Sequence, residues 1–418
     1  MSSASHVAFV GLGYIGLPTA VVMANSGLNV TGIDVNAANV EKINRGEVTI
    51  VEPGLEDELK KALDSGRFSA STKQVHADAY IIAVPTPFTD GHAVDMKFIY
   101  SAAEAIAPQL EGNELVVLES TSPPLTTQKM AKRILELRPD LRADEDNTTP
   151  TEKTVYFAHC PERILPGKAM EELRSNDRII GGQTSEATRR ATEIYASFCE
   201  GELLPTNDVT AEMAKLTENS FRDVNIAFAN ELSLIADNLG INVWELIELA
   251  NHHPRVNILQ PGPGVGGHCI AVDPWFIVSS DPENSKLIGT ARRINDDKPE
   301  WVIDKVIEAV EKSEGKNLAV LGLSFKPDID DLRESPALEI AKRIANQFKD
   351  TQINVVEPNI KTLPDSLSNF DNVELKPLEQ AVESANVVLL LVDHRQFKEY
   401  DAEKLKHKTV IDTKGLWQ

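Results

Sequence analysis

Cysteine is scarce in this chain of 418 residues, which has only Cys160, Cys199 and Cys269. Three scattered thiols are too few for a disulfide framework, and none of them makes the paired CxxC spacing of a common metal site. We therefore expect no metal. The odd count suits a reducing, cytoplasmic compartment in which at least one thiol is kept for chemistry.

Positive charge is also in short supply. Lysine and arginine number 42 against 64 aspartates and glutamates, which gives a formal net charge of −22 at pH 7. Because such a chain would repel a phosphate backbone, we expect no nucleic-acid partner. An anionic substrate would need a locally basic pocket. An ordinary solvated surface is the simplest source of the acidity.

One uncharged run, residues 7–24, is long enough to resemble a membrane span or a signal sequence. It lacks a basic segment before it, and it contains Gly11, Gly13, Gly16 and Pro18. The glycine spacing explains the run better than a membrane does, so we expect no membrane partner.

Short β-rich runs alternate with helical stretches in the N-terminal half. We expect a helix over residues 96–107 and an exposed polar loop over 140–153. This alternation predicts a parallel, doubly wound sheet. The expected strands are residues 7–10, 29–33, 79–84, 115–119 and 155–158.

Residues 210–239 contain neither proline nor glycine, and Gly240 follows as a plausible C-cap. Apolar residues recur there at helical spacing, which predicts one long helix connecting two domains. The apolar stripe of this helix is also a possible dimer interface. Its members are Ala214, Phe221, Val224, Phe228, Leu232, Ile235 and Leu239.

From residue 316 the strand pattern returns. The expected helix is 336–347, and the expected strands are residues 317–323, 353–356, 387–392 and 409–411. The chain as a whole therefore predicts an α/β fold, with two Rossmann-like, doubly wound domains joined by a long central helix and a helical segment.

The glycine spacing near the N-terminus has the form GxGxxG, in the sequence GLGYIG at 11–16. It follows an apolar strand and opens a helix, which is the context of a dinucleotide site. Asp34, about twenty residues on, would accept the ribose hydroxyls of NAD and repel the extra phosphate of NADP. Thr86 lies where a later strand meets the ligand. A glycine turn without ligand and a plain proline-rich turn are the alternatives.

The sequence QPGPGVGGHCIAVDPWF at 260–276 is the most informative stretch. Its glycines suit a backbone that wraps closely around a ligand. If a helical turn begins at Cys269, the thiol lies near the positive end of that helix, which favours a thiolate. Asp273, four residues on, more plausibly orders a water or the base. A small buried cysteine is the alternative.

Lys215, Asn219 and Arg222 interrupt the long helix at i, i+4 and i+7, so they share one face. A lysine beside an asparagine can stabilise a developing alkoxide by charge and hydrogen bond. A solvated stripe on the helix surface explains the same spacing equally well.

Together these motifs resemble the UDP-glucose/GDP-mannose dehydrogenase family, from about residue 7 to the C-terminus. The carriers of the resemblance are long and occur in one order. They are GLGYIGLP at Gly11, PTP at Pro85, EST at Glu119, CPERILPGKAMEEL at Cys160, AKLTENSFRDVNIAFANEL at Ala214, GPGVGGHCIAVDPWF at Gly262 and FKPDIDDLRESPA at Phe325.

The resemblance implies an NAD-binding domain over 1–205, a central helical dimerisation and catalytic segment over 206–300, and a C-terminal UDP-sugar-binding α/β domain over 301–418. It implies a homodimer or a dimer of dimers, and a place in cell-surface polysaccharide biosynthesis. The implied reaction oxidises a primary alcohol at C6 to a carboxylate while two NAD molecules are reduced.

The resemblance also assigns roles to individual residues. Cys269 is the nucleophile, and Lys215 is the proton donor or acceptor and the oxyanion partner. The residues expected to assist them or to position water and cofactor are Asn219, Asp273, Thr121 and Glu162. The expected cofactor contacts are Gly11, Gly13, Tyr14, Ile15, Gly16, Asp34, Thr86, Thr121 and Arg333. The expected substrate contacts are Arg163, Ile164, Lys215, Asn219, Arg222, His253, Arg255, Gly266 and Lys326.

A cysteine suits a double oxidation at one carbon. Its thiol can hold the intermediate aldehyde as a thiohemiacetal, which still has a hydride to give. Val272 stands where UDP-glucose dehydrogenases usually carry a lysine, and His268 stands where they have a small residue. The sequence is therefore closer to the branch that acts on N-acetylated hexosamines. Resemblance favours UDP-N-acetyl-D-mannosamine, with UDP-N-acetylglucosamine or UDP-glucose as alternatives. A two-electron hydroxyacid dehydrogenase and a non-catalytic NAD-binding protein are more distant ones.

Overall fold

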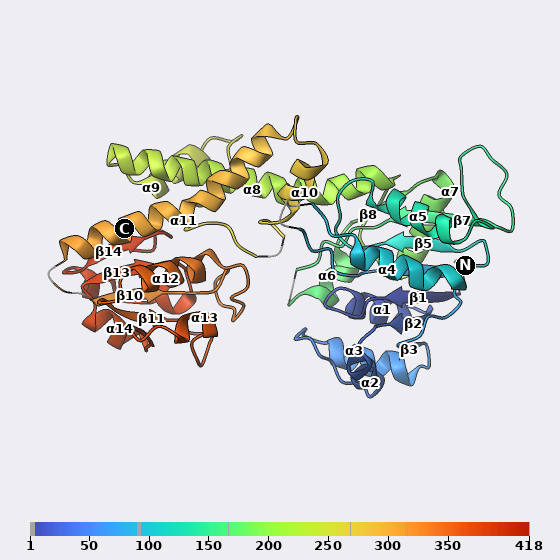
Figure 1. Cartoon of the computed structure of the whole chain (residues 1–418), viewed down its shortest axis with the longest axis horizontal. Coiled ribbons are helices and arrows are strands. Elements are labelled where there is room, and N and C mark those ends of the chain that lie inside the picture. Colours follow the sequence, from blue (N-terminus) through green and yellow to red (C-terminus); the bar gives the residue numbers. More distant parts are fainter. Residues whose placement is uncertain are drawn as a thin grey trace. The chain divides into compact units, whose positions relative to one another are not determined.

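The computed structural model describes residues 5–89, 93–165, 167–267, 269–313, 315 and 317–417. The chain divides into two compact units, Met1–Thr217 and Glu218–Gln418, and each is described by itself (Figure 1). Among the described helices, none is long and apolar enough to cross a bilayer.

The first unit is built on a sheet whose strands follow the order β3-β2-β1-β4-β5-β7-β8-β9. The expected strands are confirmed to within two residues at each end. The strands are β1 (His6–Val10), β2 (Asn29–Ile33), β3 (Phe68–Ser71), β4 (Ala79–Ile82), β5 (Leu115–Leu118), β7 (Thr154–His159), β8 (Arg178–Gly182) and β9 (Leu203–Asn207), and the short β6 (Arg142–Ala143) pairs with β7.

The expected parallel sheet is confirmed except at one pair of strands. β8 runs antiparallel to β7, with Ala158 opposite Gly182 and His159 opposite Gly181. In the described part of the link between the two strands, the one helix is the short α6 (Ala169–Ser175). An antiparallel neighbour needs no crossover to the far end of the sheet, which fits this short link.

Helices cover both faces of the first sheet, because its strands are apolar on both sides. Along β1, Val7 and Phe9 pack into one core, and Ala8 and Val10 pack into the other. The first core is covered by helices that include α1 (Gly16–Asn25), α3 (Leu55–Asp64) and α7 (Ser185–Tyr195), and the second by α4 (Lys97–Ile106) and α5 (Thr126–Leu137).

The second unit contains a sheet of order β12-β11-β10-β13-β14, and every pair in it is parallel. Helix α12 (Pro336–Gln347) has the expected bounds, because Ser335 caps its first turn and Pro336 fits the first helical position. Helix α14 (Leu378–Ser384) lies on the other face. The strands are β10 (Asn317–Leu321), β11 (Gln352–Val356), β12 (Val373–Leu375), β13 (Val387–Leu390) and β14 (Thr409–Asp412).

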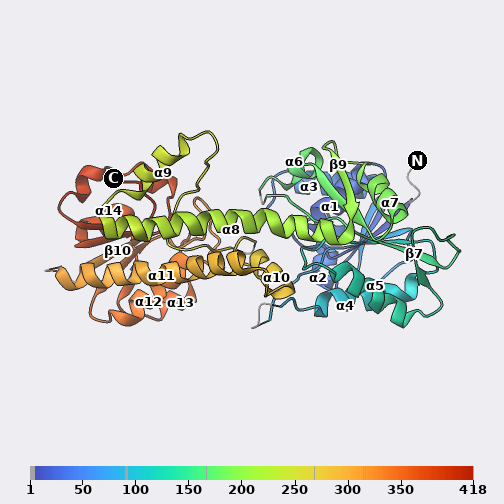
Figure 2. The same cartoon turned by 90° about the horizontal axis from the view of Figure 1, so that it is seen from above.

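Four helices of the described part of the chain lie between the two sheets in sequence. The long helix α8 (Asp208–Leu239) begins two residues earlier than expected and ends where expected. Helix α11 (Lys286–Lys312), which contains Pro299, was not expected. The other two are α9 (Val243–Asn251) and α10 (Asp273–Ser280). In the second unit, α8 and α11 lie side by side (Figure 2).

Buried polar side chains join α8 to α11. The guanidinium of Arg292 pairs with the carboxylate of Asp223, and both side chains are fully buried. Asn295 donates to Asp223 Oδ1 at 2.8 Å, and Asn230 donates to Asn295 Oδ1 at 2.8 Å. Burial raises the pKa of Asp223 to about 6, although Arg292 opposes the rise. We call these four residues the α8–α11 cluster.

The α8–α11 cluster predicts a large loss of stability when its carboxylate is removed. Asp223→Ala leaves the Arg292 charge buried without its main partner, so the free energy of unfolding should fall by about 3–5 kcal/mol. Urea melts of the purified protein measure this change.

Asp237 and Lys305 provide the matched control, because they join the same two helices at 2.7 Å but are about a third exposed. Asp237→Ala should change the free energy of unfolding by less than about 1 kcal/mol. Equal losses in the two variants would contradict the role given to the buried pair.

Candidate functional site

The glycine turn at 11–16 in the first unit has little space at two glycines and open space at one. Gly11 has φ +100°, and an added Cβ would lie 2.3 Å from the carbonyl oxygen of Ala83. An added Cβ on Gly16 would lie 1.8 Å from the carbonyl oxygen of Gly11. At Gly13 it would meet nothing within 4 Å. The turn is therefore tight at its ends and leaves room at Gly13 for a ligand beside the start of α1.

Asp34 lies at the end of β2, next to that turn. One carboxylate oxygen accepts the N–H of Leu12 at 3.1 Å, and the other accepts the N–H of Asn36 at 2.8 Å. A cavity of about 340 Å³ adjoins the carboxylate. Its lining is Leu12, Gly13, Asp34, Asn36, Ala38, Asn39, Lys42, Thr49 and Ile50. The residues present thus fit a dinucleotide, since the space at Gly13, a helix start and a carboxylate meet at one edge of the sheet.

Tyr14 connects the glycine turn to the segment before α6. Its hydroxyl donates to Glu52 Oε2 at 2.6 Å and accepts the N–H of Gly167 at 3.0 Å. Burial and the neighbouring Glu52 raise the pKa of Tyr14 to about 12. Ile15 occupies the N-cap position of α1. Sequence reasoning missed Glu52, which stands in a segment without a recognisable motif.

The two threonines expected near the cofactor lie together. Thr86 donates its hydroxyl to the carbonyl oxygen of Thr121 at 2.7 Å. Ser120, one residue before, bonds both the N–H and the carbonyl of Val84 at 2.9 and 2.7 Å. The loops that follow β4 and β5 are thereby joined at the carboxyl edge of the sheet.

Glu162 is held from two sides. Its Oε2 accepts Arg178 at 2.7 Å, and its Oε1 accepts the backbone N–H groups of Arg163 and Ile164 at 2.6 and 3.0 Å. Arg178 also pairs with Glu119 at 3.4 Å. Burial, reinforced by the charge of Glu162, raises the pKa of Glu119 to about 8. Burial thus favours the uncharged form of Glu119 beside the guanidinium of Arg178.

Arg178 was missed from the sequence, because a single arginine at the start of an unexpected strand carries no pattern.

The side chain of Arg163, which was expected to contact the substrate, donates to the carbonyl oxygen of Asp177.

The glycine-rich segment 262–267 in the second unit packs closely against the loop after β10. An added Cβ on Gly266 would lie 2.3 Å from the carbonyl oxygen of Glu334 and 2.5 Å from Pro336 Cδ. Gly267 has φ +87°, and an added Cβ would lie 2.9 Å from the ring of Phe325. Any side chain would push these two segments apart, so the glycines are needed for their contact.

The α8–α11 cluster anchors the chain at the first residue of this segment and again at Ile270, just after Cys269. Asn230 accepts the N–H of Gly262 at 2.9 Å, and Arg292 donates to the carbonyl oxygen of Ile270 at 3.4 Å. The chain that carries Cys269 is therefore fixed to two helices.

Cys269 itself is exposed and lies one turn before α10. Its carbonyl oxygen accepts the N–H groups of Val272 at 3.1 Å and Asp273 at 2.9 Å, so a helical turn does begin there. Asp273 is buried and accepts the side-chain amide of Asn219 at 2.6 Å. Asn219 and Asp273, expected to act with the cysteine, are thus in contact. His268 lies outside the described residues.

Four expected residues lie on α8 or after α9. Lys215 is half-buried on α8, one turn before Asn219, while Arg222 is exposed. His253 and Arg255 are exposed in the segment after α9, where the N–H of Arg255 donates to His253 Nδ1 at 3.3 Å.

Lys326 and Arg333 are exposed on the loop that follows β10. Arg333 pairs with Asp331 at 2.6 Å.

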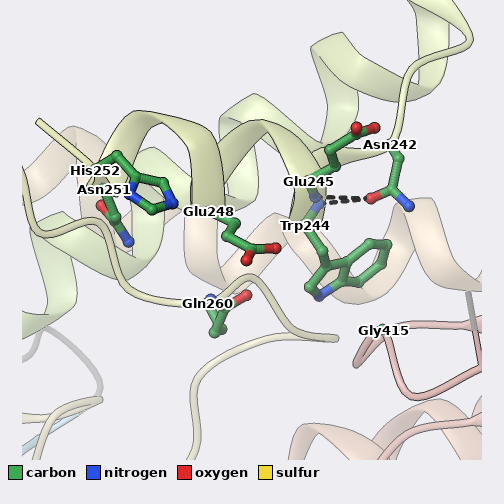
Figure 3. A pocket seen from close by; sticks show the side chains of 8 residues that line it. All are labelled: Asn242, Trp244, Glu245, Glu248, Asn251, His252, Gln260 and Gly415. Atoms are coloured by element: carbon green, nitrogen blue, oxygen red, sulfur yellow. Dashed lines mark hydrogen bonds between the residues drawn. The ribbon is translucent and has the colours of Figure 1, made fainter.

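A separate hollow of about 630 Å³ lies beside α9 in the second unit (Figure 3). Glu245 and Glu248 contribute carboxylates to it, and its described lining contains no lysine or arginine. Such a hollow is unsuited to a diphosphate. Its lining is Asn242, Trp244, Glu245, Glu248, Asn251, His252, Gln260 and Gly415.

Three family models match the chain in succession. The NAD binding domain of the UDP-glucose/GDP-mannose dehydrogenase family matches residues 5–199, its central domain matches 209–297, and its UDP binding domain matches 319–418.

Individual relatives agree with these matches over the full length. A UDP-N-acetyl-D-mannosamine dehydrogenase of Yersinia pestis is 54% identical, over 99% of each chain. An NDP-N-acetyl-D-galactosaminuronic acid dehydrogenase of Ralstonia nicotianae is 52% identical, over 98% of this chain and 96% of the relative. The solved UDP-D-ManNAc dehydrogenase of Pyrococcus horikoshii has a TM-score of 0.84 and 38% identity, over 99% of this chain and 96% of that one.

The expected fold, with its Rossmann-like α/β domains, is confirmed by this structural similarity, and the expected cofactor is confirmed by the match of the NAD binding domain. The chain belongs to the UDP-glucose/GDP-mannose dehydrogenase family and is an NAD-dependent oxidoreductase.

Proposed function

We propose that this chain oxidises the C6 alcohol of UDP-N-acetyl-D-mannosamine to the carboxylate of UDP-N-acetyl-D-mannosaminuronate, with two NAD reduced per sugar. The observation that carries the proposal is Cys269, exposed one turn before α10 on an anchored glycine-rich segment. A two-electron dehydrogenase needs no such thiol, whereas a double oxidation at one carbon does.

The proposed reaction proceeds by oxidation, addition of the thiol, a second oxidation and hydrolysis. NAD, when bound, accepts a hydride from C6 in each of two oxidations. The first oxidation leaves an aldehyde, and the Cys269 thiol adds to its carbonyl to form a thiohemiacetal. Loss of a second hydride and of the hydroxyl proton gives a thioester. Water attacks the thioester, which breaks the C–S bond and releases the carboxylate and the thiol.

The other site residues supply charge and position. We assign Lys215 to proton transfer at the alcohol oxygen and to the developing oxyanion. Asn219 and Asp273, in contact at 2.6 Å, support it, and Asp273 orders the attacking water. Glu162 and Thr121 position water and cofactor at the edge of the first sheet.

We propose a different function for each of three consecutive parts of the chain. Residues 1–205 bind NAD, 206–300 form the helical dimerisation and catalytic segment, and 301–418 bind the UDP-sugar. The three family matches support these assignments. We also propose a cytoplasmic location and a role in cell-surface polysaccharide biosynthesis.

Two observations favour UDP-N-acetyl-D-mannosamine as the sugar substrate. Val272 replaces the lysine of the glucose enzymes, and the relative from Yersinia pestis is named for UDP-N-acetyl-D-mannosamine. NADH formation with UDP-N-acetylmannosamine, UDP-N-acetylglucosamine, UDP-N-acetylgalactosamine, UDP-glucose and GDP-mannose tests the choice. We expect the highest kcat/KM for UDP-N-acetylmannosamine, by at least about tenfold. A higher value for any other sugar would overturn it. Cys269→Ser, as control, should lose turnover.

Gly13 tests the cofactor site without disturbing the fold. An alanine methyl at this position meets no protein atom within 4 Å, so Gly13→Ala should fold normally. The methyl would occupy the space through which the pyrophosphate approaches the backbone. We expect the KM for NAD to rise about tenfold or more, with thermal stability unchanged. An unchanged KM would show that the dinucleotide binds elsewhere.

A homodimer through α8 is the proposed assembly. Phe221, Phe228, Ile235 and Leu239 are 67%, 52%, 47% and 67% exposed along this helix. Their spacing of seven, seven and four residues places them on one face. An apolar row of this length on the surface is typical of an interface between subunits.

Charge on the α8 face should separate the subunits. Phe228→Glu combined with Ile235→Lys would place charges in the proposed interface, and we expect light scattering to report a monomer where the unmodified protein is a dimer or larger. Glu383→Gln on α14 is the control and should leave the mass unchanged. A monomeric unmodified protein would contradict the assembly.

A further inference from the structure

The loop after β10 repeats the backbone geometry of the dinucleotide turn. Gly322 has φ +92°, and its N–H donates to the carbonyl oxygen of Val356 at 2.8 Å. In the first sheet, Gly11 has φ +100° and donates to Ile33 at the same distance, 2.8 Å. Each turn is thus joined to the last residue of the neighbouring strand.

An acidic residue follows the neighbouring strand in each sheet: Asp34 follows β2, and Glu357 follows β11. The two carboxylates have different hydrogen-bond partners. Glu357 Oε2 accepts the N–H groups of Leu323 and Ser324 at 2.8 and 3.2 Å, and Oε1 accepts the N–H and the side-chain amide of Asn359, both at 3.2 Å. With His394 as a fifth donor, at 3.0 Å, every acceptor position of this buried carboxylate is occupied. Glu357 therefore has no capacity left for a ribose.

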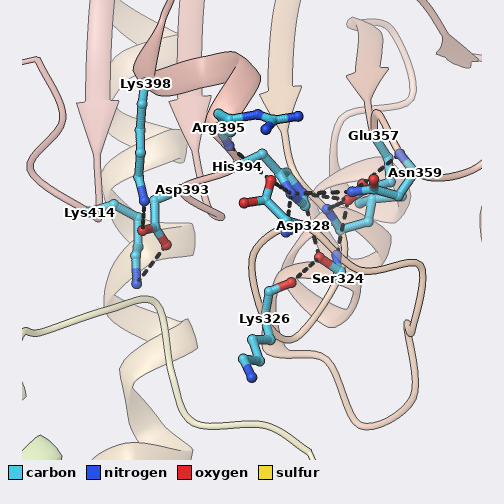
Figure 4. A network of polar contacts seen from close by, with 11 residues as sticks. Ser324, Lys326, Asp328, Glu357, Asn359, Asp393, His394, Arg395, Lys398 and Lys414 are labelled. Atoms are coloured by element: carbon cyan, nitrogen blue, oxygen red, sulfur yellow. Dashed lines mark hydrogen bonds and ion pairs between the residues drawn. The ribbon is translucent and has the colours of Figure 1, made fainter. Parts of the chain in front are cut away.

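His394 fills the place beside this carboxylate. The ring is 1% exposed and lies on the segment after β13 (Figure 4). The backbone N–H of Asp328 donates to Nδ1 at 2.9 Å, so Nδ1 is an acceptor and carries no proton. Nε2 must then carry the hydrogen and donate it to Glu357. The contacts thus define a neutral imidazole that connects the loops following β10, β11 and β13.

This connection lies at the switch point of the second sheet. β10 is central, with β11 on one side and β13 on the other, and ligands of such sheets bind outside the carboxyl ends of the strands at this point. The loop that His394 holds contains Lys326, whose side chain points away from the cluster. Ser324 donates its hydroxyl to the carbonyl oxygen of Lys326 at 2.7 Å. The lysine is therefore held, through its backbone, by the buried cluster.

We propose that His394 is a positioning residue for the nucleotide of the substrate. With Glu357 it fills the place in the second sheet that corresponds to the dinucleotide site of the first. It also fixes residues 323–328 so that Lys326 contacts the diphosphate. The proposal rests on the proposed function, because it concerns the UDP group of that substrate. Because His394 is buried against Glu357 and the backbone of Asp328, it acts through the loop, and its removal should affect binding of the nucleotide and leave the chemistry intact.

Two replacements of His394 provide the test. His394→Leu has a similar volume and no polar atoms, and we expect the Kd of UDP, measured by calorimetry, and the KM of the UDP-sugar to rise about tenfold. The kcat and the KM for NAD should stay within about twofold. His394→Gln, whose amide can accept from Asp328 and donate to Glu357, should restore both constants to within about threefold.

Val388→Ala separates positioning from stability. Val388 lies on β13 and is fully buried on the α14 face, away from the loop. This variant should lower the melting temperature and leave the Kd of UDP unchanged. If His394→Leu does not fold, Ser324→Ala carries the test, with an expected rise of about threefold in the Kd of UDP.

An unchanged Kd of UDP in the folded variant, or an equal rise in Val388→Ala, overturns the proposal. A fall in kcat with an unchanged KM does so too. A wild-type enzyme that binds UDP but turns over a different UDP-sugar contradicts the proposed substrate, while the Kd comparison still decides the role of His394. A wild-type enzyme that binds no UDP overturns both proposals.

Discussion

The close contact between the glycine-rich segment 262–267 and the loop after β10 is the constraint on which the second unit depends. At Gly266 there is no room for even a methyl group, because a backbone carbonyl would lie 2.3 Å away. Arg292, buried with Asp223, fixes the chain that follows this segment by donating to the carbonyl oxygen of Ile270. Cys269 is thereby presented from a backbone that is fixed by packing and by buried charge, although the thiol itself is exposed.

The two sheets use one turn geometry for different purposes. In the first sheet the turn is open at Gly13, and Asp34 borders a cavity of about 340 Å³. In the second sheet a serine replaces the open glycine, and Glu357 and His394 are both buried. One fold can thus provide a dinucleotide site in one domain and a rigid loop for a different nucleotide in the other, because only a few side chains at the switch point differ.

Patterns that are local in the sequence predicted the structure well. The apolar periodicity of α8 placed that helix to within two residues, and the helix expected over 336–347 has the bounds of α12. Contacts that are distant in the sequence had no such signal. Arg178 pairs with two glutamates, 59 and 16 residues away, and His394 with a glutamate 37 residues away, so only the folded chain brings these charges together. The antiparallel β8 was missed for the same reason, since strand direction depends on the route of the connection.

We propose that one thiol, Cys269, holds one carbon through two oxidations. The number of NADH molecules formed per UDP-N-acetylmannosamine consumed tests it most directly, with absorbance for NADH and chromatography for the sugar. We expect a ratio of two, with the uronate as product. A ratio of one, with a free aldehyde as product, would contradict it, because Cys269 would then have no second oxidation to support.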